Sequence, residues 1–479
     1  MAKTASEVTI DFLGCASSEV TQSMYLVTYK DIKILLDCGL YQSSNPLTDY
    51  RINHTPIKGL KPSEIDYIFI SHSHVDHCGL LPYLYANGCK AAIIVPHCNK
   101  KLIGLMLRDC AKIFEGEAER LERNLKIKNA VPLYTESDVK LCEQYIQEYD
   151  FDEMYELTKG VYFEFFHSGH ILGSAQILLQ FQVGTLIKRI GYTGDIGCPK
   201  ARQFCKKCEL MPFVDVMIGE STYAVLGKGN TDPISVSQEI LERVIRQSLQ
   251  RTNSKVVIPV FSLDRLQTVL YELMLIQRRI GGSKFPIIVD APLGVEISKT
   301  YNELIPEYLD SSGVSRWKKV WVNKSIIWNT DHNASKYWQD APGNAVVLTT
   351  SGMCNNGRSV SWLQNTLPCS DNYIVFVGYA AEKTVASYVK KATSKSVIKI
   401  GGQSVPCKAN ITELNSFSSH MNYKELLDYY CKSNYLRLYL VHGNMDNKAL
   451  FAGTVENHLR IHGKTGRVYA AQQGLRVTV

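Results

Sequence analysis

The order of apolar and polar residues predicts a first region of short strands interrupted by helices. Apolar runs bounded by turn residues are typical of strands. We expect strands at Glu7–Leu13, Met24–Tyr29, Ile32–Asp37, Tyr67–Ser71, Ala91–Pro96, Val161–His167, Ala175–Val183 and Leu186–Thr193. Helical spacing of apolar residues predicts helices at Leu80–Tyr85 and over residues 101–125. Sheets covered by helices, an α/β sandwich, are the expected result.

From about residue 234 the pattern changes to apolar strands that alternate with helices. Helices are predicted at Ile234–Gln250 and Leu263–Arg279, and strands at Lys255–Val260, Phe285–Val289, Asn344–Thr350 and Tyr373–Gly378. Such alternation indicates a parallel, doubly wound sheet. After residue 405 short strands return, including Leu436–Val441. We therefore interpret the chain as one domain inserted into another.

Composition and charge indicate an ordinary globular protein but do not identify a binding partner. Hydrophobic residues make up 45% and charged residues 21% of the 479 residues, and the formal net charge of +7 permits a polyanionic partner but does not require one. The N-terminal residues lack a signal-peptide pattern, and no apolar stretch reaches the roughly 18 residues of a membrane span. We expect a cytoplasmic protein.

The 14 cysteines have irregular spacings, which favours reduced thiols. One cluster, Cys198, Cys205 and Cys208, contains a CxxC pair and leaves a zinc knuckle open as an alternative. No fourth thiol lies nearby in the sequence, so ordinary thiols are the favoured interpretation.

The strongest chemical signal is the run Ser71-His72-Ser73-His74-Val75-Asp76-His77 after an apolar strand. In extended chain, alternation places His72, His74 and Asp76 on one side, and a turn would bring His77 beside them. Burying three imidazoles and a carboxylate is costly unless they bind a cation. Imidazole with carboxylate suits zinc. A solvated histidine-rich loop is the alternative.

Two later positions extend this cluster only if folding brings them to it. His170 follows a strand in Ser-Gly-His-Ile-Leu-Gly-Ser, and Asp195 ends Gly-Tyr-Thr-Gly-Asp. A carboxylate has two oxygens, so Asp195 could bridge two cations. Asp37 is either an outer partner that orients a ligand histidine or a solvated turn residue.

The motifs together resemble the metallo-β-lactamase superfamily, a four-layer αβ/βα sandwich. HxHxDH, Gly-His and Thr-Gly-Asp occur in the superfamily's order. Gly219-Glu220-Ser221-Thr222-Tyr223, Phe417-Ser418-Ser419-His420-Met421-Asn422-Tyr423 and Val441-His442-Gly443-Asn444 resemble motifs A, B and C of the β-CASP nucleases. Pro259-Val260-Phe261-Ser262, Ser351-Gly352-Met353 and Gly378-Tyr379 resemble segments of the β-CASP insert. The match is greatest with the RNA-cleaving branch, which includes the cleavage and polyadenylation endonuclease.

The resemblance implies a metallo-β-lactamase domain over residues 1–222 and 406–479, with a β-CASP domain at 223–405. It implies two zinc ions per chain, bound by His72, His74, Asp76, His77, His170, Asp195 and His442, with Asp195 as the bridge. Catalytic roles fall on Asp76, on His420 as general acid, and on Glu220, which orients His420. A histidine at motif C is typical of RNA-cleaving members.

Two positions depart from the family pattern, and four are candidate substrate contacts. Asn422 replaces the usual aspartate of motif B, and Lys383 follows Glu382 where relatives often have glycine. The candidate contacts to substrate phosphates are Ser351 and Gly352 before a possible helix, together with Arg358 and Lys383. Ordinary surface charge is the alternative for the two cations.

The expected activity is hydrolysis of phosphodiester bonds in single-stranded RNA by a metal-activated water, with His420 protonating the leaving oxygen. Endonucleolytic cleavage is favoured over exonucleolytic cleavage, and a homodimer is plausible by analogy. The alternatives are a DNA nuclease, a hydrolase of small esters or thioesters, and a catalytically silent scaffold.

Overall fold

Strands with alternating side chains begin the chain, as the sequence predicts. In β1 (Val8–Phe12) and β8 (Val161–His167) every second residue is buried, because successive side chains of a strand point to opposite faces. The computed structural model describes residues 7–17, 19–125, 129–197, 204–227, 232–281 and 285–479. The chain divides into two compact units, one made of residues up to 199, 205–228 and 420–479, the other of residues 200–204 and 229–419.

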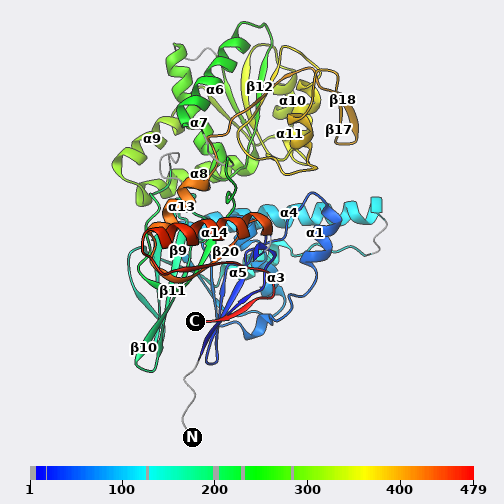
Figure 1. The fold of residues 1–479 in the computed structure, drawn as a ribbon. Helices are drawn as coiled ribbons and strands as arrows, with labels where there is room; N and C mark the ends of the chain where they lie inside the picture. Colours follow the sequence, from blue (N-terminus) through cyan, green and yellow to red (C-terminus); the bar gives the residue numbers. More distant parts are fainter. Residues whose placement is uncertain (1–6, 18, 126–128, 198–203, 228–231, 282–284) are drawn as a thin grey trace. The chain divides into compact units, whose positions relative to one another are not determined.

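The first unit contains two seven-stranded sheets (Figure 1). The order of the first sheet is β22 (Arg476–Thr478), β1, β2 (Tyr25–Tyr29), β3 (Ile32–Leu36), β4 (Tyr67–Phe69), β5 (Ala92–Pro96) and β6 (Ile146–Tyr149). The order of the second sheet is β21 (Arg467–Ala470), β20 (Tyr435–Val441), β11 (Val214–Glu220), β10 (Leu186–Tyr192), β9 (Ala175–Val183), β8 and β7 (Tyr155–Thr158). In both sheets, antiparallel strands on one side continue into parallel strands on the other.

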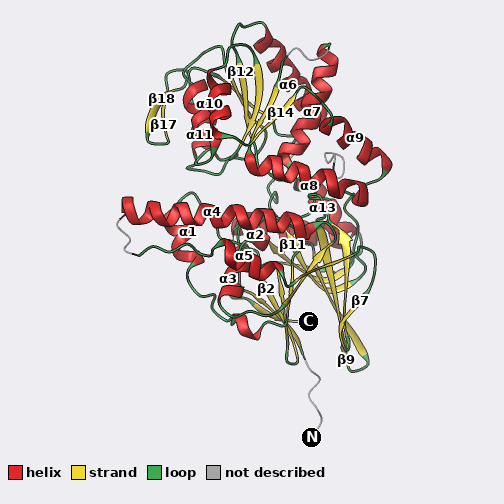
Figure 2. Cartoon of the chain, turned by 180° about the vertical axis from the view of Figure 1, so that it is seen from behind, coloured by secondary structure: helices red, strands yellow, loops and turns green. Residues whose placement is uncertain are grey.

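Three apolar cores show that this unit has four layers. Phe12, Phe163 and Ile190 belong to the core between the two sheets. A second core packs the first sheet against helices α3 (Leu81–Ala86), α4 (Asn99–Leu125) and α5 (Glu136–Glu143). A third packs the second sheet against α13 (Tyr423–Lys432) and α14 (Met445–Ile461). The two figures view the unit from opposite sides: α14 lies in front of the strands in Figure 1 and α5 lies in front of them in Figure 2, which confirms the αβ/βα sandwich.

The remaining helices of the first unit are short. They are the 3₁₀ turns η1 (Cys15–Ser17) and η2 (Pro62–Glu64) and the α-helices α1 (Pro46–Asn53) and α2 (Val75–Cys78). Helix α2 carries part of the histidine-rich run, so its start decides where those side chains point.

The second unit is built around a six-stranded parallel sheet, which confirms the predicted inserted domain. The strand order is β14 (Ile326–Asn329), β13 (Ile287–Asp290), β15 (Ala345–Thr349), β12 (Lys255–Pro259), β16 (Tyr373–Phe376) and β19 (Asn410–Glu413). A separate hairpin joins β17 (Val397–Ile400) and β18 (Gln403–Pro406). The helices are α6 (Ile234–Leu249), α7 (Arg265–Ile280), α8 (Pro292–Tyr308), α9 (Ser311–Trp321), α10 (His332–Asp340), α11 (Arg358–Thr366) and α12 (Val385–Lys390).

The structure differs from the sequence-based expectation mainly after residue 405. Strand β19 pairs with β16 of the inserted sheet, so this unit extends to Ser419 rather than ending at 405. The boundary before the insert lies at 228 and 229 rather than at 222 and 223. Helices α13 and α14 occupy segments where we expected only short strands. Among the helices that the structure describes, none is both long enough and apolar enough to cross a membrane.

Candidate metal centre

The histidine-rich run changes conformation halfway along its length. After β4 the chain continues without regular secondary structure to His74, which has an extended backbone and is the N-cap of α2. Asp76 and His77 therefore lie in a helical turn, and the expectation that Asp76 follows the extended alternation of His72 and His74 was wrong. The turn separates the side chains of the run into two groups.

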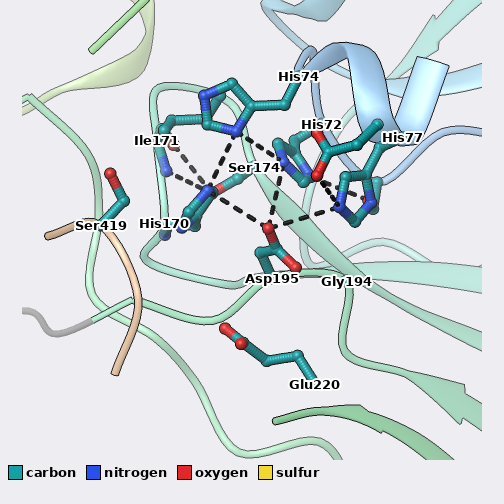
Figure 3. Close-up of polar contacts among 12 residues, drawn as sticks. His72, His74, His77, His170, Ile171, Ser174, Gly194, Asp195, Glu220 and Ser419 are labelled. Atoms are coloured by element: carbon teal, nitrogen blue, oxygen red, sulfur yellow. Dashed lines mark hydrogen bonds and ion pairs between the residues drawn. The ribbon is translucent and has the colours of Figure 1, made fainter. Parts of the chain in front are cut away.

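The first group of possible metal donors is His72, His74, His170 and Asp195, whose donor atoms all lie within 4.8 Å of one another. Nδ1 of His74 is 3.1 Å from Nε2 of His72 and 3.2 Å from Nε2 of His170. Oδ2 of Asp195 lies 3.7 Å from His72 Nε2 and 3.6 Å from His170 Nε2. Figure 3 shows these side chains turned toward one another.

The second group is Asp76, His77 and His442, within the same 4.8 Å limit. Oδ2 of Asp76 is 3.8 Å from His77 Nε2 and 3.3 Å from His442 Nε2. Oδ2 of Asp195 lies 3.4 Å from His77 Nε2. The same oxygen of Asp195 thus faces imidazoles of both groups, as a bridging carboxylate would.

The donor set fits divalent cations. Two nitrogens bound about 2.0–2.1 Å from one tetrahedral zinc ion lie about 3.4 Å apart. The six distances given above within the two groups run from 3.1 to 3.8 Å. Among the described residues, His77 Nε2 and Asp195 Oδ1 are buried without a hydrogen-bond partner. A buried polar atom without a partner is costly, and a cation would remove that cost.

The protonation states of the first group suit a cation. Burial lowers the pKa of His72 and of His170 well below the ordinary value, so each imidazole keeps a free electron pair. Burial opposes the charged form of Asp195, but the neighbouring histidines His442 and His77 outweigh it and hold its pKa well below the ordinary value. In the first group, His72 and His170 therefore favour the neutral form beside a carboxylate.

Asp37 orients one histidine of the second group. It is fully buried, and Oδ2 accepts hydrogen bonds from Nδ1 of His77 at 2.6 Å, from the Tyr192 hydroxyl at 2.6 Å and from the Ser71 hydroxyl at 2.8 Å. Oδ1 accepts from the Ser71 backbone N–H. Of the two interpretations left open by the sequence, the solvated turn residue is wrong, and the contact with His77 is the one that an outer partner would make. The sequence carried no signal for the contributions of Ser71 and Tyr192.

His420 and Glu220 form a pair beside the two donor groups. Glu220 is 1% exposed, and its Oε1 lies 3.1 Å from Nδ1 of His420. The Ile196 backbone N–H donates to the same oxygen at 2.8 Å. Burial disfavours a charged His420, but the carboxylates of Glu220 and Asp195 outweigh this effect and raise its pKa. Nδ1 of His420 is 3.9 Å from Oδ2 of Asp195, so the pair adjoins the bridging position.

The four candidate phosphate contacts lie in the second unit, in different local surroundings. Arg358 pairs with the buried carboxylate of Asp290 and donates to the carbonyl oxygen of Thr330, and its side chain is only 14% exposed. Ser351 and Gly352 do not begin a helix, because α11 starts at Arg358 after Gly357 with φ 72°. Lys383 is exposed, and its φ of 63° is a left-handed conformation that favours glycine, as the expected family pattern has there.

The other departure and the cysteine cluster have structural explanations. Asn422 is the N-cap of α13, and its Oδ1 accepts from the backbone N–H groups of Lys424 and Glu425, as an aspartate would. The thiols of Cys205 and Cys208 donate to the carbonyl oxygens of Gly169 and Glu209. Cys198 lies outside the described residues. Among the described residues, neither Cys205 nor Cys208 belongs to a group of side chains that could hold a metal ion.

A further donor group, Asp152, His167 and Glu209, lies in the same unit but differs in its surroundings. Burial and the positive charge of Lys206 lower the pKa of His167 to about 3. The Glu209 carboxylate accepts a hydrogen bond from the His167 backbone N–H at 2.8 Å. With a lysine already beside it, this group has less need of a cation than the two main groups.

Comparison with known families agrees with the fold and the donor sets. The metallo-beta-lactamase superfamily matches residues 18–198, and the Beta-Casp domain family matches residues 266–389. The fold is also similar to that of an Enterococcus faecalis protein of unknown function, known from a crystal structure. The similarity covers 99% of this chain and 100% of that one, with a TM-score of 0.52 and 11% sequence identity.

Relatives extend this similarity over almost the whole chain. A ribonuclease of Thermus thermophilus is 28% identical over 91% of this chain and 94% of its own length. The transcription termination factor FttA of Methanocaldococcus jannaschii is 26% identical over 94% of this chain and 69% of its own. The cleavage and polyadenylation specificity factor 73 of Drosophila melanogaster is 26% identical over 90% of this chain and 59% of its own. The chain belongs to the β-CASP family of the metallo-β-lactamase superfamily.

Proposed function

We propose that this protein is a zinc-dependent ribonuclease that hydrolyses phosphodiester bonds of single-stranded RNA, with two zinc ions per chain. One observation carries the proposal: Asp195 Oδ2 faces both donor groups, at 3.6 Å from His170 Nε2 and 3.4 Å from His77 Nε2. The first ion would be held by His72, His74 and His170, the second by Asp76, His77 and His442, and Asp195 would bridge them. When bound, the ions supply activated water and neutralise charge on the phosphate.

The proton for the leaving oxygen comes from His420 in this proposal. Its Nδ1 is bonded to Glu220, which leaves Nε2 to donate. The carboxylates of Glu220 and Asp195 raise the pKa of His420 against the opposing effect of burial, which favours the protonated imidazole that a general acid needs. Glu220 is itself fixed by the Ile196 and Thr222 backbone N–H groups, so the imidazole has one orientation.

The choice of RNA rests on His442 and on the relatives. His442 lies in the second donor group, and the names of the relatives include a ribonuclease. We also expect endonucleolytic cleavage, a cytoplasmic location and a homodimer.

The test is cleavage of end-labelled single-stranded RNA and DNA of the same sequence. We would compare zinc-loaded protein, metal-stripped protein, Asp76→Ala and the control Asp31→Ala, an exposed carboxylate of the same unit. RNA cleavage that requires zinc and Asp76 but not Asp31 is expected, and internal fragments would indicate an endonuclease. Cleavage of DNA alone, or of neither polymer with zinc bound, would contradict the proposal.

A further inference from the structure

Thr222 lies against the ring of His442. Its Oγ1 is 2.9 Å from Nδ1 of His442 and 3.4 Å from the His442 carbonyl oxygen. The two residues are 220 positions apart, and they meet because β11 and β20 are parallel neighbours that pair as far as Glu220 and Val441. Ser221 strengthens this contact, since its hydroxyl donates to the Val441 carbonyl oxygen at 2.6 Å.

His442 needs an external group to fix its ring. It follows the end of β20 and has a φ of 53°, a left-handed conformation that is uncommon for any residue except glycine. Its Nε2 is directed to Asp76 Oδ2 at 3.3 Å. For Nε2 to offer an electron pair to a cation, Nδ1 must carry the proton and donate it to an acceptor. The hydroxyl oxygen of Thr222 is placed to be that acceptor.

The two histidines of the second donor group are held by acceptors of different strength. Nδ1 of His77 is bonded to the buried carboxylate of Asp37 at 2.6 Å. Nδ1 of His442 is bonded to a hydroxyl at 2.9 Å. Hydrogen bonds to ionised acceptors are stronger than those to neutral ones. Oδ1 of Asp195 lies farther from Nδ1 of His442, at 3.4 Å, and accepts no hydrogen bond, so the neutral hydroxyl of Thr222 is the hydrogen-bond partner of this nitrogen.

The backbone of Thr222 makes a second connection. Its N–H donates to Oε2 of Glu220 at 3.1 Å, and Oε1 of Glu220 lies 3.1 Å from Nδ1 of His420. One residue thus contacts the second donor group through its side chain and the Glu220–His420 pair through its backbone.

We propose that Thr222 is a positioning residue that orients His442 for cation binding and ties this histidine to the Glu220–His420 pair. The inference rests on the proposed two-metal site. Partners of this kind commonly change metal affinity by about 10–100-fold when they are removed.

The test measures zinc affinity directly. Metal-stripped full-length protein would be titrated with zinc in competition with a chromophoric chelator, for wild type, Thr222→Val, Thr222→Ser and Thr454→Val. Thr454 is a matched control because it is a half-buried threonine of the same unit whose hydroxyl donates to the carbonyl oxygen of Leu450. Circular dichroism of the metal-stripped variants would verify that each is folded.

We expect two zinc equivalents in the wild type, with one of them bound about 10–100-fold more weakly in Thr222→Val. Thr222→Ser keeps a hydroxyl and should restore the affinity, and Thr454→Val should match the wild type. Equal binding by wild type and Thr222→Val, or no recovery in Thr222→Ser, would overturn the inference and leave the two-metal proposal standing. A wild type that does not bind two zinc ions would overturn both.

Discussion

Two buried aspartates, one in each unit, have opposite surroundings. Asp290 is fully buried and accepts hydrogen bonds from Asn329 Nδ2 at 2.8 Å, from Trp362 Nε1 at 2.6 Å, from the Ser335 hydroxyl and from the Arg358 guanidinium. Asp195 is 2% exposed and faces imidazole nitrogens, while its Oδ1 has no hydrogen-bond partner among the described residues.

The difference separates a structural carboxylate from a proposed metal ligand. Protein donors reach both oxygens of Asp290, so its buried charge needs no other partner. Around Asp195 the neighbouring side chains are imidazoles that can give electron pairs to a cation, and Oδ1 of Asp195 has no hydrogen-bond partner among the described residues, which suits the proposed metal site. Burial alone is therefore a poor guide to function, and the chemistry of the neighbouring atoms decides the role.

Asp195→Asn should have the largest effect. The amide carries no charge and cannot bridge two cations, so we expect loss of at least one zinc equivalent. Cleavage of RNA should fall by more than about 10³-fold, beyond the usual cost of losing one charge-stabilising group. Metal analysis and initial rates at saturating RNA test this. Two retained zinc ions with normal cleavage would show that Asp195 does not act as a bridge.

His420→Ala separates proton donation from metal binding. The imidazole is bonded to Glu220 and belongs to neither main donor group. We expect kcat to fall by about 10²–10⁴-fold, the usual contribution of a positioned general acid. The zinc content should stay at the wild-type value, as measured by elemental analysis. Loss of zinc would instead identify His420 as a ligand.

Asp290→Asn should affect stability and leave the metal content unchanged. Removing this charge leaves the Arg358 guanidinium, 14% exposed, without its ionic partner. Breaking a buried ion pair in this way costs about 3–5 kcal/mol. All five tryptophans, Trp317, Trp321, Trp328, Trp338 and Trp362, lie in the inserted unit. Urea unfolding followed by tryptophan fluorescence therefore reports on this unit alone.

Asp371→Asn is the matched control for that experiment. Asp371 pairs with Arg251 in the same unit, but both side chains are 48% exposed. An exposed pair contributes about 0–1 kcal/mol. If both variants shift the urea midpoint equally, the burial of the Asp290 pair is not what matters.

Asn422→Asp should have the smallest effect. The side chain caps α13 by accepting from two backbone N–H groups, and aspartate is as good an N-cap as asparagine. We expect the free energy of unfolding to change by less than about 0.5 kcal/mol and zinc affinity to be unchanged. A large loss of zinc affinity would show that the motif B position acts on the metal centre after all.

Much of the fold was readable from local patterns. The apolar alternation of β8 and the buried run of β12 follow directly from residue order, and both strands were predicted to within one residue. Helix α14 was missed although Phe451, Ala452, Val455 and Leu459 have helical spacing and are buried. Strand β19 has no such signature, since it is an edge strand of the inserted sheet, and its pairing alone assigns it to that unit.

For the candidate site, the sequence by itself determined the chemical types of donor and the local run that concentrates them. Four donors lie within six residues, His72 to His77, so their proximity needs no long-range contact. Only the tertiary structure decided which of these donors lie together. His74 meets His170 across 96 residues, and Asp76 meets His442 across 366. Such meetings depend on which strands pair, a property of the whole sheet that no local pattern contains. The same applies to Thr222, whose place beside His442 results from the parallel pairing of β11 with β20.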